Sequence, residues 1–419
     1  MRTLYTLLWC LALPLLPLRL WWRGRREPGY RAHLGERFGI YADDVPRPAG
    51  EVIWIHAVSL GETRAAEPLV RRIAGERPQA TILLTSMTAT GREAGRAYAG
   101  LRVVQAWLPY DAPFAVRAFL DRFRPRAGLL METELWPNLV HACRNRGVPV
   151  YLVNARMSAK SATGYRRFQA LARPMLEALS GVAAQTPADA ARLEALGARD
   201  VAVTGSLKFD AAVPDAMREL GAALRARLGR DRTVWLAAST RDGEEALILD
   251  ALAKAPLPDN ALLLLVPRHP QRFDEVFALV ASRGLACVRR TSDAPVGAAT
   301  RVMLGDSLGE MLAYCATADV AFVGGSLLPL GGQNLIEPIA LGVPTLVGPH
   351  TFNFAEATER AIEAGAARRV ADADALVAEV SRLLGNPSER AAMAESARTF
   401  MTAHRGAADR LWGWLEPRL

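Results

Sequence analysis

The chain has 419 residues, of which 51% are hydrophobic and 22% are charged, and these ordinary globular values exclude a disordered chain or a coiled coil. At about 150 residues per domain the length predicts two or three domains, and a mean hydropathy of +0.08 argues against many membrane spans. The formal net charge of +8 indicates an anionic partner. Nucleic acid is disfavoured, because no basic stripe is interleaved with aromatic residues. The four cysteines lie far apart, which argues against a zinc site or a disulfide framework.

We expect residues 1–28 to form a membrane anchor with a basic flank. Residues 3–18 are almost wholly apolar, and Trp21 and Trp22 are typical of a membrane interface. The run is marginally long for a span and contains Pro14 and Pro17, so the anchor either spans the membrane or is monotopic. A signal peptide is the alternative, but no small-residue cleavage site follows. The positive-inside rule places the rest of the chain in the cytoplasm, because the run is followed by Arg19, Arg23, Arg25, Arg26 and Arg31.

From residue 51 short apolar runs alternate with amphipathic stretches, which is typical of buried parallel strands in βα units. The expected strands are Glu51–Ser59, Thr81–Thr88, Val103–Leu108, Ala127–Glu132, Val148–Ala155 and Val201–Ser206, then Thr233–Thr240, Ala261–Pro267, Arg301–Asp306, Val320–Ser326 and Pro344–Gly348. The fold class is therefore α/β, with two doubly wound, Rossmann-like domains facing a central cleft. We expect domains at 29–213 and 232–395, a linker at 214–231, and a C-terminal helix at 396–419 that packs back on the first domain.

The first expected strand runs into a Ser-x-Gly-Glu turn formed by Ser59, Gly61 and Glu62. Glu62 begins the next helix, whose dipole would hold the carboxylate ionised and ready to take a proton from an attacking hydroxyl. The alternative is that Glu62 is only a favourable acid in a first helical turn.

Three further segments of the first half carry candidate chemistry. Glu132 and Glu134 end a buried strand, where they could orient a cation, assist proton transfer or bind sugar hydroxyls, or only cap the next helix. Arg156 lies in a basic, hydroxyl-rich segment that could bind a phosphorylated acceptor or be a solvated face. Lys208, one of few lysines in an arginine-rich chain, could neutralise a leaving phosphate or a substrate carboxylate.

In the second half the candidate residues suit an anionic ligand. Arg268 and His269 follow Pro267 at the end of a buried strand, and paired glycines near residue 325 would let backbone N–H groups approach a phosphate. Asn334 would cap a helix, with Glu337 completing a capping box or meeting ribose hydroxyls. The remaining candidates at strand ends and helix starts are Thr240, Arg241, Gly309, Glu310, Met311, Ser326, Gly332, Gln333, Leu335 and Ile336.

The sequence lacks a P-loop and an early GxGxxG motif, which argues against a P-loop nucleotide site and a simple dinucleotide site. The DxD-like string of Asp372 and Asp374 precedes an amphipathic stretch and fits a helix start better than a metal site. We expect no metal and no cofactor, so helix N-termini and cations would stabilise a leaving phosphate.

In this order, His56–Glu62, Glu132–Pro137, Pro267–His269 and Gly331–Pro338 closely resemble the 3-deoxy-D-manno-octulosonic acid (Kdo) transferases of Gram-negative bacteria. The resemblance covers essentially the whole chain. It implies a GT-B fold and metal-independent, inverting transfer of Kdo from CMP-Kdo to a lipid A precursor at the cytoplasmic face of the inner membrane.

Residue by residue, the resemblance implies that Glu62 is the base and that Glu132 and Lys208 stabilise the transition state. It also implies that Arg268 and His269, Gly309–Met311 and Asn334–Glu337 hold CMP. Two alternatives remain: another GT-B enzyme, such as a UDP-sugar lipid glycosyltransferase or a UDP-sugar epimerase, and a non-catalytic membrane scaffold.

Overall fold

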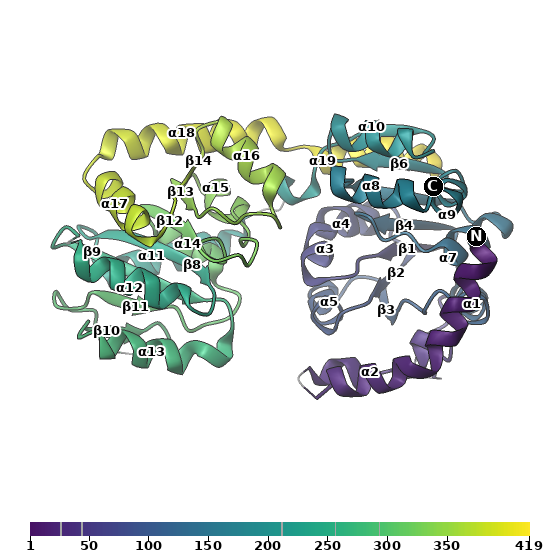
Figure 1. Ribbon diagram of the computed structural model, residues 1–419, viewed down its shortest axis with the longest axis horizontal. Helices are drawn as coiled ribbons and strands as arrows, with labels where there is room; N and C mark the ends of the chain where they lie inside the picture. The colour runs from purple at the N-terminus through teal and green to yellow at the C-terminus, as the bar shows by residue number, and fades with distance from the viewer. Residues whose placement is uncertain (26, 43–44, 211–212, 256, 293) are drawn as a thin grey trace. The chain divides into compact units, whose positions relative to one another are not determined.

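The computed structural model describes residues 1–25, 27–42, 45–210, 213–255, 257–292 and 294–419. The chain divides into two compact units (Figure 1). Unit 1 comprises Met1–Ala211 and Arg405–Leu419, and unit 2 comprises Ala212–His404.

Unit 1 is built on a parallel sheet in the strand order β3-β2-β1-β4-β5-β6-β7. The order reverses between β1 and β4, which is the arrangement of a doubly wound Rossmann-like fold. The strands are β1 (Val52–His56), β2 (Thr81–Ser86), β3 (Val103–Trp107), β4 (Ala127–Met131), β5 (Val150–Ala155), β6 (Gly181–Ala184) and β7 (Val201–Val203).

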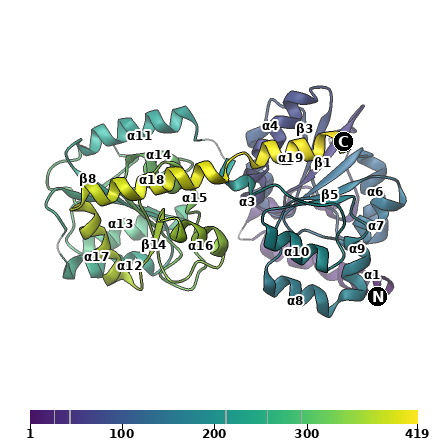
Figure 2. The same cartoon turned by 90° about the horizontal axis from the view of Figure 1, so that it is seen from above.

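Helices cover both faces of this sheet (Figures 1 and 2). Alternate side chains of β1 divide between two cores: Trp54 packs with Phe119 of α6, and Ile55 lies in the core that contains Leu69 of α4. The helices of unit 1 are α1 (Arg2–Ala12), α2 (Leu16–Arg23), α3 (Leu60–Ala65), α4 (Glu67–Glu76), α5 (Ala89–Ala94), α6 (Pro113–Phe123), α7 (Pro137–Asn145), α8 (Ala159–Arg167), α9 (Gln169–Leu176), α10 (Pro187–Ala195) and α19 (Ala407–Leu415).

Unit 2 repeats the architecture with the strand order β10-β11-β9-β8-β12-β13-β14, again all parallel. Its strands are β8 (Thr233–Thr240), β9 (Ala261–Pro267), β10 (Cys287–Arg289), β11 (Val302–Leu304), β12 (Val320–Val323), β13 (Thr345–Val347) and β14 (Ala367–Arg369). Its helices are α11 (Asp215–Leu228), α12 (Glu244–Lys254), α13 (Phe273–Ser282), α14 (Met311–Thr317), α15 (Ile336–Ala340), α16 (Ala355–Glu363), α17 (Ala373–Leu384) and α18 (Pro387–His404).

The stretch 214–231, expected as a linker, is instead occupied mainly by α11 and belongs to unit 2. Leu224 and Leu228 are buried in one core of that unit, and α11 packs on α14. The many charged residues of this stretch suggested a linker, but its leucines at positions 220, 224 and 228 form the apolar stripe of an amphipathic helix.

The C-terminal segment also differs from the expected helix at 396–419. Helix α18 begins at Pro387 and ends at His404, and Gly406, with φ of 81°, separates it from α19. Leu411, Trp412 and Leu415 of α19 are buried in the core of unit 1, and Figure 2 shows α19 beside α4.

The N-terminal helices lie on unit 1 rather than apart from it. Trp9 and Leu13 pack against a cluster of Leu16, Leu20, Tyr30 and Tyr110. Within the described residues, Arg2–Arg23 is the stretch long and apolar enough to cross a membrane, with 22 residues and a mean hydropathy of 1.5. Only 11% of its apolar window is buried.

Candidate active site

The candidate residues of unit 1 gather where the strand order of its sheet reverses. Glu62 follows β1, and Glu132 follows β4, which is hydrogen-bonded to β1. Ligands of doubly wound sheets bind beyond the carboxyl ends of strands at this point. The parallel register of the two strands therefore brings the two carboxylates to one edge of the sheet.

Glu62 is held by its own turn. Ser59 is the N-cap of α3, and Glu62 folds back so that its carboxylate accepts hydrogen bonds from Val58 N at 2.7 Å and Ser59 Oγ at 3.1 Å. Ser59 Oγ in turn caps Glu62 N, so the turn is a variant of a capping box in which the carboxylate binds the backbone N–H before the N-cap. Gly61 between them is exposed, and a Cβ there would meet only Ser59 Oγ, at 3.9 Å.

The pKa of Glu62 is raised to about 7, which differs from the expectation that the helix dipole holds it fully ionised. Burial is the largest cause, and the negative charges of Glu132 and Glu134 add to it, whereas the hydrogen bonds from Val58 and Ser59 oppose it. A carboxylate with a pKa near the working pH can both take up and release a proton, as a general base requires.

Glu132 is paired with Lys208, whose Nζ lies 2.7 Å from its Oε1. Glu132 has φ of 56°, a left-handed conformation that is uncommon for a residue with a side chain and costs on the order of 1 kcal/mol or more. Such strain concentrates at functional sites. The pair joins two segments that are far apart in the sequence.

Asn154 ties the lysine segment to the sheet. It is the penultimate residue of β5, with φ of 51°, and its Oδ1 accepts a hydrogen bond from Leu207 N at 3.0 Å. Lys208 follows in the same 3₁₀ turn, Leu207–Asp210. Asn154 thereby sets the position from which Lys208 reaches Glu132.

Glu134 is a third carboxylate of this edge. Burial and the neighbouring charge of Glu132 raise its pKa, and the Trp136 side chain partly opposes the rise. Arg156 follows β5 directly and is half-buried. Among the residues that the structure describes, no group of three His, Cys, Asp or Glu side chains is arranged to hold a metal ion.

The candidate residues of unit 2 form a cationic cluster at the carboxyl ends of β8 and β9. The pKa of His269 is lowered by burial and by the positive charges of Arg241, Arg268 and Arg272. Arg268 donates its backbone N–H to Thr240 O at 2.9 Å, which holds the two strand ends together. A cluster of cations that disfavours another positive charge is a suitable site for a phosphate.

We expected the backbone N–H groups of the glycine-rich segment after β12 to be open to a ligand, but several of them bind a protein side chain. The buried carboxylate of Glu244 accepts hydrogen bonds from the backbone N–H groups of Gly325, Ser326 and Leu327 at 2.5, 3.0 and 3.0 Å. It also accepts one from Arg241 N at 2.9 Å. The anion in this loop is therefore the protein's own side chain.

Two side chains of unit 2 that we expected to contact a ligand, Thr240 and Ser326, are instead buried. The Thr240 hydroxyl is buried and donates to Glu245 Oε1 at 2.8 Å. Ser326 is buried, donates to Val323 O and accepts from Gly348 N. Both hydroxyls bind protein groups, so neither offers a free polar atom to a ligand.

The remaining candidates of unit 2 lie on two loops that precede helices. Gly309 is exposed with φ of 81°, Glu310 pairs with Arg290 at 3.2 Å, and Met311 begins α14. The N-cap of α15 is Leu335 and not Asn334 as expected; Asn334, one residue earlier, accepts a hydrogen bond from Ile336 N at its Oδ1, at 3.1 Å. Leu335 is buried, Gln333 and Glu337 are half-buried, and Gly332 has φ of 74°.

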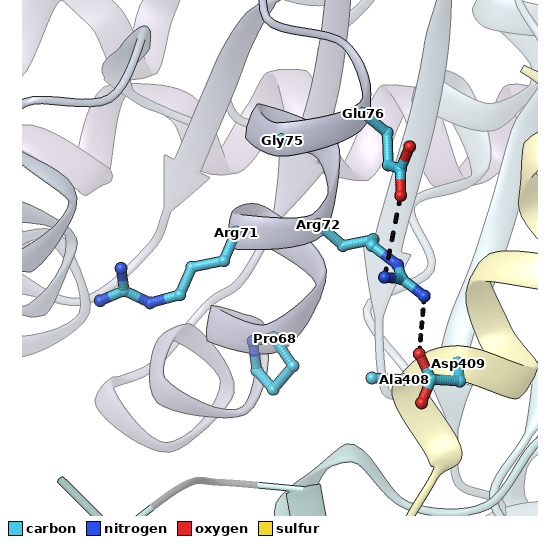
Figure 3. A pocket seen from close by; sticks show the side chains of 7 residues that line it. All are labelled: Pro68, Arg71, Arg72, Gly75, Glu76, Ala408 and Asp409. Carbon is cyan, nitrogen blue, oxygen red and sulfur yellow. Dashed lines mark hydrogen bonds and ion pairs between the residues drawn. The ribbon is translucent and has the colours of Figure 1, made fainter. Parts of the chain in front are cut away.

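A separate groove of about 370 Å³ lies between α4 and α19 (Figure 3). Its charged side chains pair with one another: Arg72 lies 2.7 Å from Asp409 and 3.7 Å from Glu76. The Arg72–Asp409 pair joins α19 to α4, and the candidate active-site residues are not part of this groove.

A family model described as 3-deoxy-D-manno-octulosonic-acid transferase (kdotransferase) matches residues 32–211. The 3-deoxy-D-manno-octulosonic acid transferase of Bordetella pertussis is 48% identical over 432 residues, covering 99% of each chain. The protein of the same name from Haemophilus influenzae is 38% identical over 426 residues, covering 100% of this chain and 99% of the relative. The chain belongs to the Kdo transferase family. It is therefore a glycosyltransferase.

A solved structure agrees with the fold. UDP-GlcNAc 2-epimerase from Neisseria meningitidis, bound to UDP-GlcNAc, matches with a TM-score of 0.61 and 15% identity over 88% of this chain and 100% of that chain. At this identity the likeness shows the GT-B fold and nothing of the substrate.

Two residues outside the predicted set organise the candidate site. Glu244 lies three residues after Arg241, which is the spacing of a capping pair and is visible in the sequence. Asn154 lies near the end of buried strand β5, where an asparagine tolerates positive φ, and this is the signal in the sequence that points to it.

Proposed function

We propose that the chain transfers Kdo from CMP-Kdo to a lipid A precursor, lipid IVA, with inversion at the anomeric carbon, in lipopolysaccharide core biosynthesis. The observation that carries the proposal is Glu62, a half-buried carboxylate with a pKa of about 7 beside the Glu132–Lys208 pair. In one step, a sugar hydroxyl of the acceptor attacks the anomeric carbon of Kdo as the bond to the CMP phosphate breaks. Glu62 accepts the hydroxyl proton.

Glu132 and Lys208 suit the charges of that step. The transition state carries positive charge on the Kdo ring and growing negative charge on the leaving phosphate. We assign Glu132 to the ring and Lys208 to the phosphate or the Kdo carboxylate. Their ion pair, with Lys208 Nζ 2.7 Å from Glu132 Oε1, holds the two side chains side by side before substrate arrives.

We assign donor binding to unit 2. Arg241 and Arg268 would bind the CMP phosphate, because their positive charges lie close together at the ends of β8 and β9, and His269 would add a hydrogen bond from a ring N–H. Gly309–Met311 and Asn334–Glu337 would hold the cytidine and ribose, and Gln333 and Gly332 adjoin the second of these segments. No metal or cofactor is needed in this proposal, since protein cations stabilise the leaving group.

The acceptor would bind unit 1 from the membrane. Arg156, Lys160 and Arg166 follow β5 or lie on α8, and the latter two are exposed, so they suit the acceptor's phosphates. Ser59, Gly61 and Glu134 lie nearest the base and would meet the acceptor sugar.

We infer that the anchor is monotopic. One face of α1 is fastened to unit 1, whereas the other exposes Leu4, Leu7, Leu8 and Leu11 by 53–74%. A helix with one docked face and one apolar face is suited to lie in the membrane surface. Arg19, Arg23, Arg25 and Arg31 would meet anionic lipid at the cytoplasmic side of the inner membrane, each worth about 1 kcal/mol. Arg26 lies outside the described residues.

The test is to incubate the purified full chain with CMP-Kdo and tetraacyl lipid A precursor and to weigh the products by mass spectrometry. We expect acceptor masses increased by Kdo, and no product with UDP-sugars as donors. Glu62→Gln should lower turnover by about 10²–10⁴-fold and retain CMP-Kdo binding. Glu67→Gln, a half-exposed acid on the next helix, should retain turnover. Unchanged acceptor, or full turnover in Glu62→Gln, would overturn the proposal.

A further inference from the structure

The inner face of α1 contacts the segment that carries the active-site acids. Tyr5 and Trp9 lie one helical turn apart on this face, and Thr6 lies beside them. All three contact residues between Tyr110 and Asn138. The contacts lie wholly within unit 1 (Figure 1).

The first contact is a hydrogen-bond network at the start of α7. Tyr5 donates its hydroxyl to Asp111 Oδ2 at 2.9 Å. The buried Asp111 carboxylate accepts from Asn138 N and Leu139 N, each at 2.8 Å, and so caps α7 from a distant segment. Thr6 Oγ1 adds a hydrogen bond to Asn138 Oδ1 at 3.1 Å.

The second contact is aromatic. The Trp9 ring lies 5.9 Å from the ring of Trp136 and stacks on Tyr110 at 5.8 Å. Such pairs contribute about 0.5–1.5 kcal/mol beyond the area they bury. Trp136 is the residue that precedes α7, and it follows Glu134 by two residues.

These contacts influence the surroundings of Glu62, because they fix the position of Glu134. The segment 132–137 begins at the strained Glu132 and ends at the first residue of α7. The charged groups that face Glu62 are Glu132, whose partner is Lys208, and Glu134. A shift of the segment 132–137 would therefore change the distance between these carboxylates.

We propose that α1 is a positioning element of the active site as well as an anchor: Tyr5 and Trp9 hold the segment 132–137 so that Glu134 stays beside Glu62. The proposal rests on the proposed role of Glu62 as the base. A helix that served only as a tether would need its outer leucines, but it would not need to cap α7 or to contact Trp136.

The test is the pH dependence of kcat/KM, measured with detergent-dispersed acceptor so that vesicle binding is not required. In Trp9→Ala we expect kcat/KM to fall about tenfold. We also expect the midpoint of its acidic limb to move down by about half a pH unit, because a carboxylate has moved away from Glu62 and its pKa falls. Tyr5→Phe should move the midpoint in the same direction by less, and it removes only one hydroxyl, so folding is not at risk.

Two controls test the route, one on α1 and one in the segment 132–137. Cys10→Ala, next to Trp9 but exposed, should leave both kcat/KM and the midpoint unchanged. Glu134→Gln should lower the midpoint by itself, and adding Trp9→Ala to it should lower the midpoint little further, since the two changes act through one group.

An unchanged midpoint in both Trp9→Ala and Tyr5→Phe overturns the positioning role. Failure of the proposed function gives a different result, namely full turnover in Glu62→Gln. A loss of turnover in Glu62→Gln together with an unmoved midpoint in the Trp9 and Tyr5 variants rejects this inference alone.

Discussion

Glu62 shows how one side chain can serve both structure and chemistry. Its carboxylate binds Val58 N and the N-cap Ser59 at the start of α3, which explains why an acid favours this position in a first helical turn. Burial nevertheless raises its pKa to about 7, so desolvation outweighs the two hydrogen bonds that favour the charged form. The reactive state of the residue is therefore the state that folding disfavours.

This conflict predicts a stability change in Glu62→Gln. The folded pKa of about 7 lies above the ordinary value of 4.5 for a glutamate, so ionisation of Glu62 lowers the stability of the wild type as the pH rises from 4.5 through 7. The variant lacks this loss. Its free energy of unfolding relative to the wild type should rise across that window by on the order of 2 kcal/mol. The measurement is thermal unfolding of both chains across a pH series.

Glu67→Gln is the matched control, because Glu67 is half-exposed and pairs with Arg71 on the surface. Its difference from the wild type should stay small, as surface pairs contribute about 0–1 kcal/mol. A Glu62→Gln difference that is the same at the acidic and basic ends of the series would contradict the raised pKa.

The candidate site could be predicted from the sequence where its residues follow strands directly. Glu62, Glu132 and Lys208 belong to such segments, and parallel strands end at one edge. The role of Glu244 could not be predicted, because its partners Gly325 to Leu327 lie more than 80 residues away. The pKa of Glu62 depends on burial by the whole unit, so it could not be predicted from the sequence either.

At the scale of elements, strands within a longer apolar run were predictable even when short, such as β7 and β13, whereas three others were not predicted. β6, β10 and β14 have three or four residues, and β14 contains two arginines, so no apolar run distinguishes them. Helix α11 was not predicted, because the many charged residues of its stretch suggested a linker. The place of α19 in unit 1 depends on tertiary contacts, among them the cap that Asp210 provides.

Asp210 fastens α19 to the 3₁₀ turn that carries Lys208. Its carboxylate accepts hydrogen bonds from Gly406 N, at 2.7 Å, and from Ala408 N in the first turn of α19. Asp210→Ala should cost about 1–2 kcal/mol, as the loss of a helix cap does. We expect faster proteolytic cleavage near residue 405, because an undocked α19 exposes its backbone.

The control for Asp210→Ala is Asp409→Ala on the same helix. Asp409 is 74% exposed and meets Arg72 in the groove of Figure 3, so its loss should cost less than 1 kcal/mol. Equal cleavage rates in the two variants would show that the cap does not hold α19.

At the scale of the whole chain, the net charge of +8 and the exposed leucines of the N-terminal helices favour the same partner, an anionic lipid surface. The buried leucines of these helices pack on unit 1, whereas the exposed leucines form the outer apolar face. Leu20 is 5% exposed and packs with Tyr30 and Tyr110, whereas Leu11 is 74% exposed and contributes to the outer face.

This division predicts opposite effects for two leucine substitutions. Leu11→Ser should weaken binding to anionic vesicles by about 1.5–3 kcal/mol and leave thermal stability unchanged, because it removes apolar area only from the membrane contact. Leu20→Ala should retain vesicle binding and lose about 2–4 kcal/mol of stability, because it opens a cavity. Vesicle sedimentation at low and high salt measures binding, and salt should weaken it in the wild type by screening the arginines. The opposite result is vesicle binding that is retained in Leu11→Ser but lost in Leu20→Ala. It would mean that the helix must leave unit 1 to enter the membrane. That would contradict a monotopic anchor docked on its inner face.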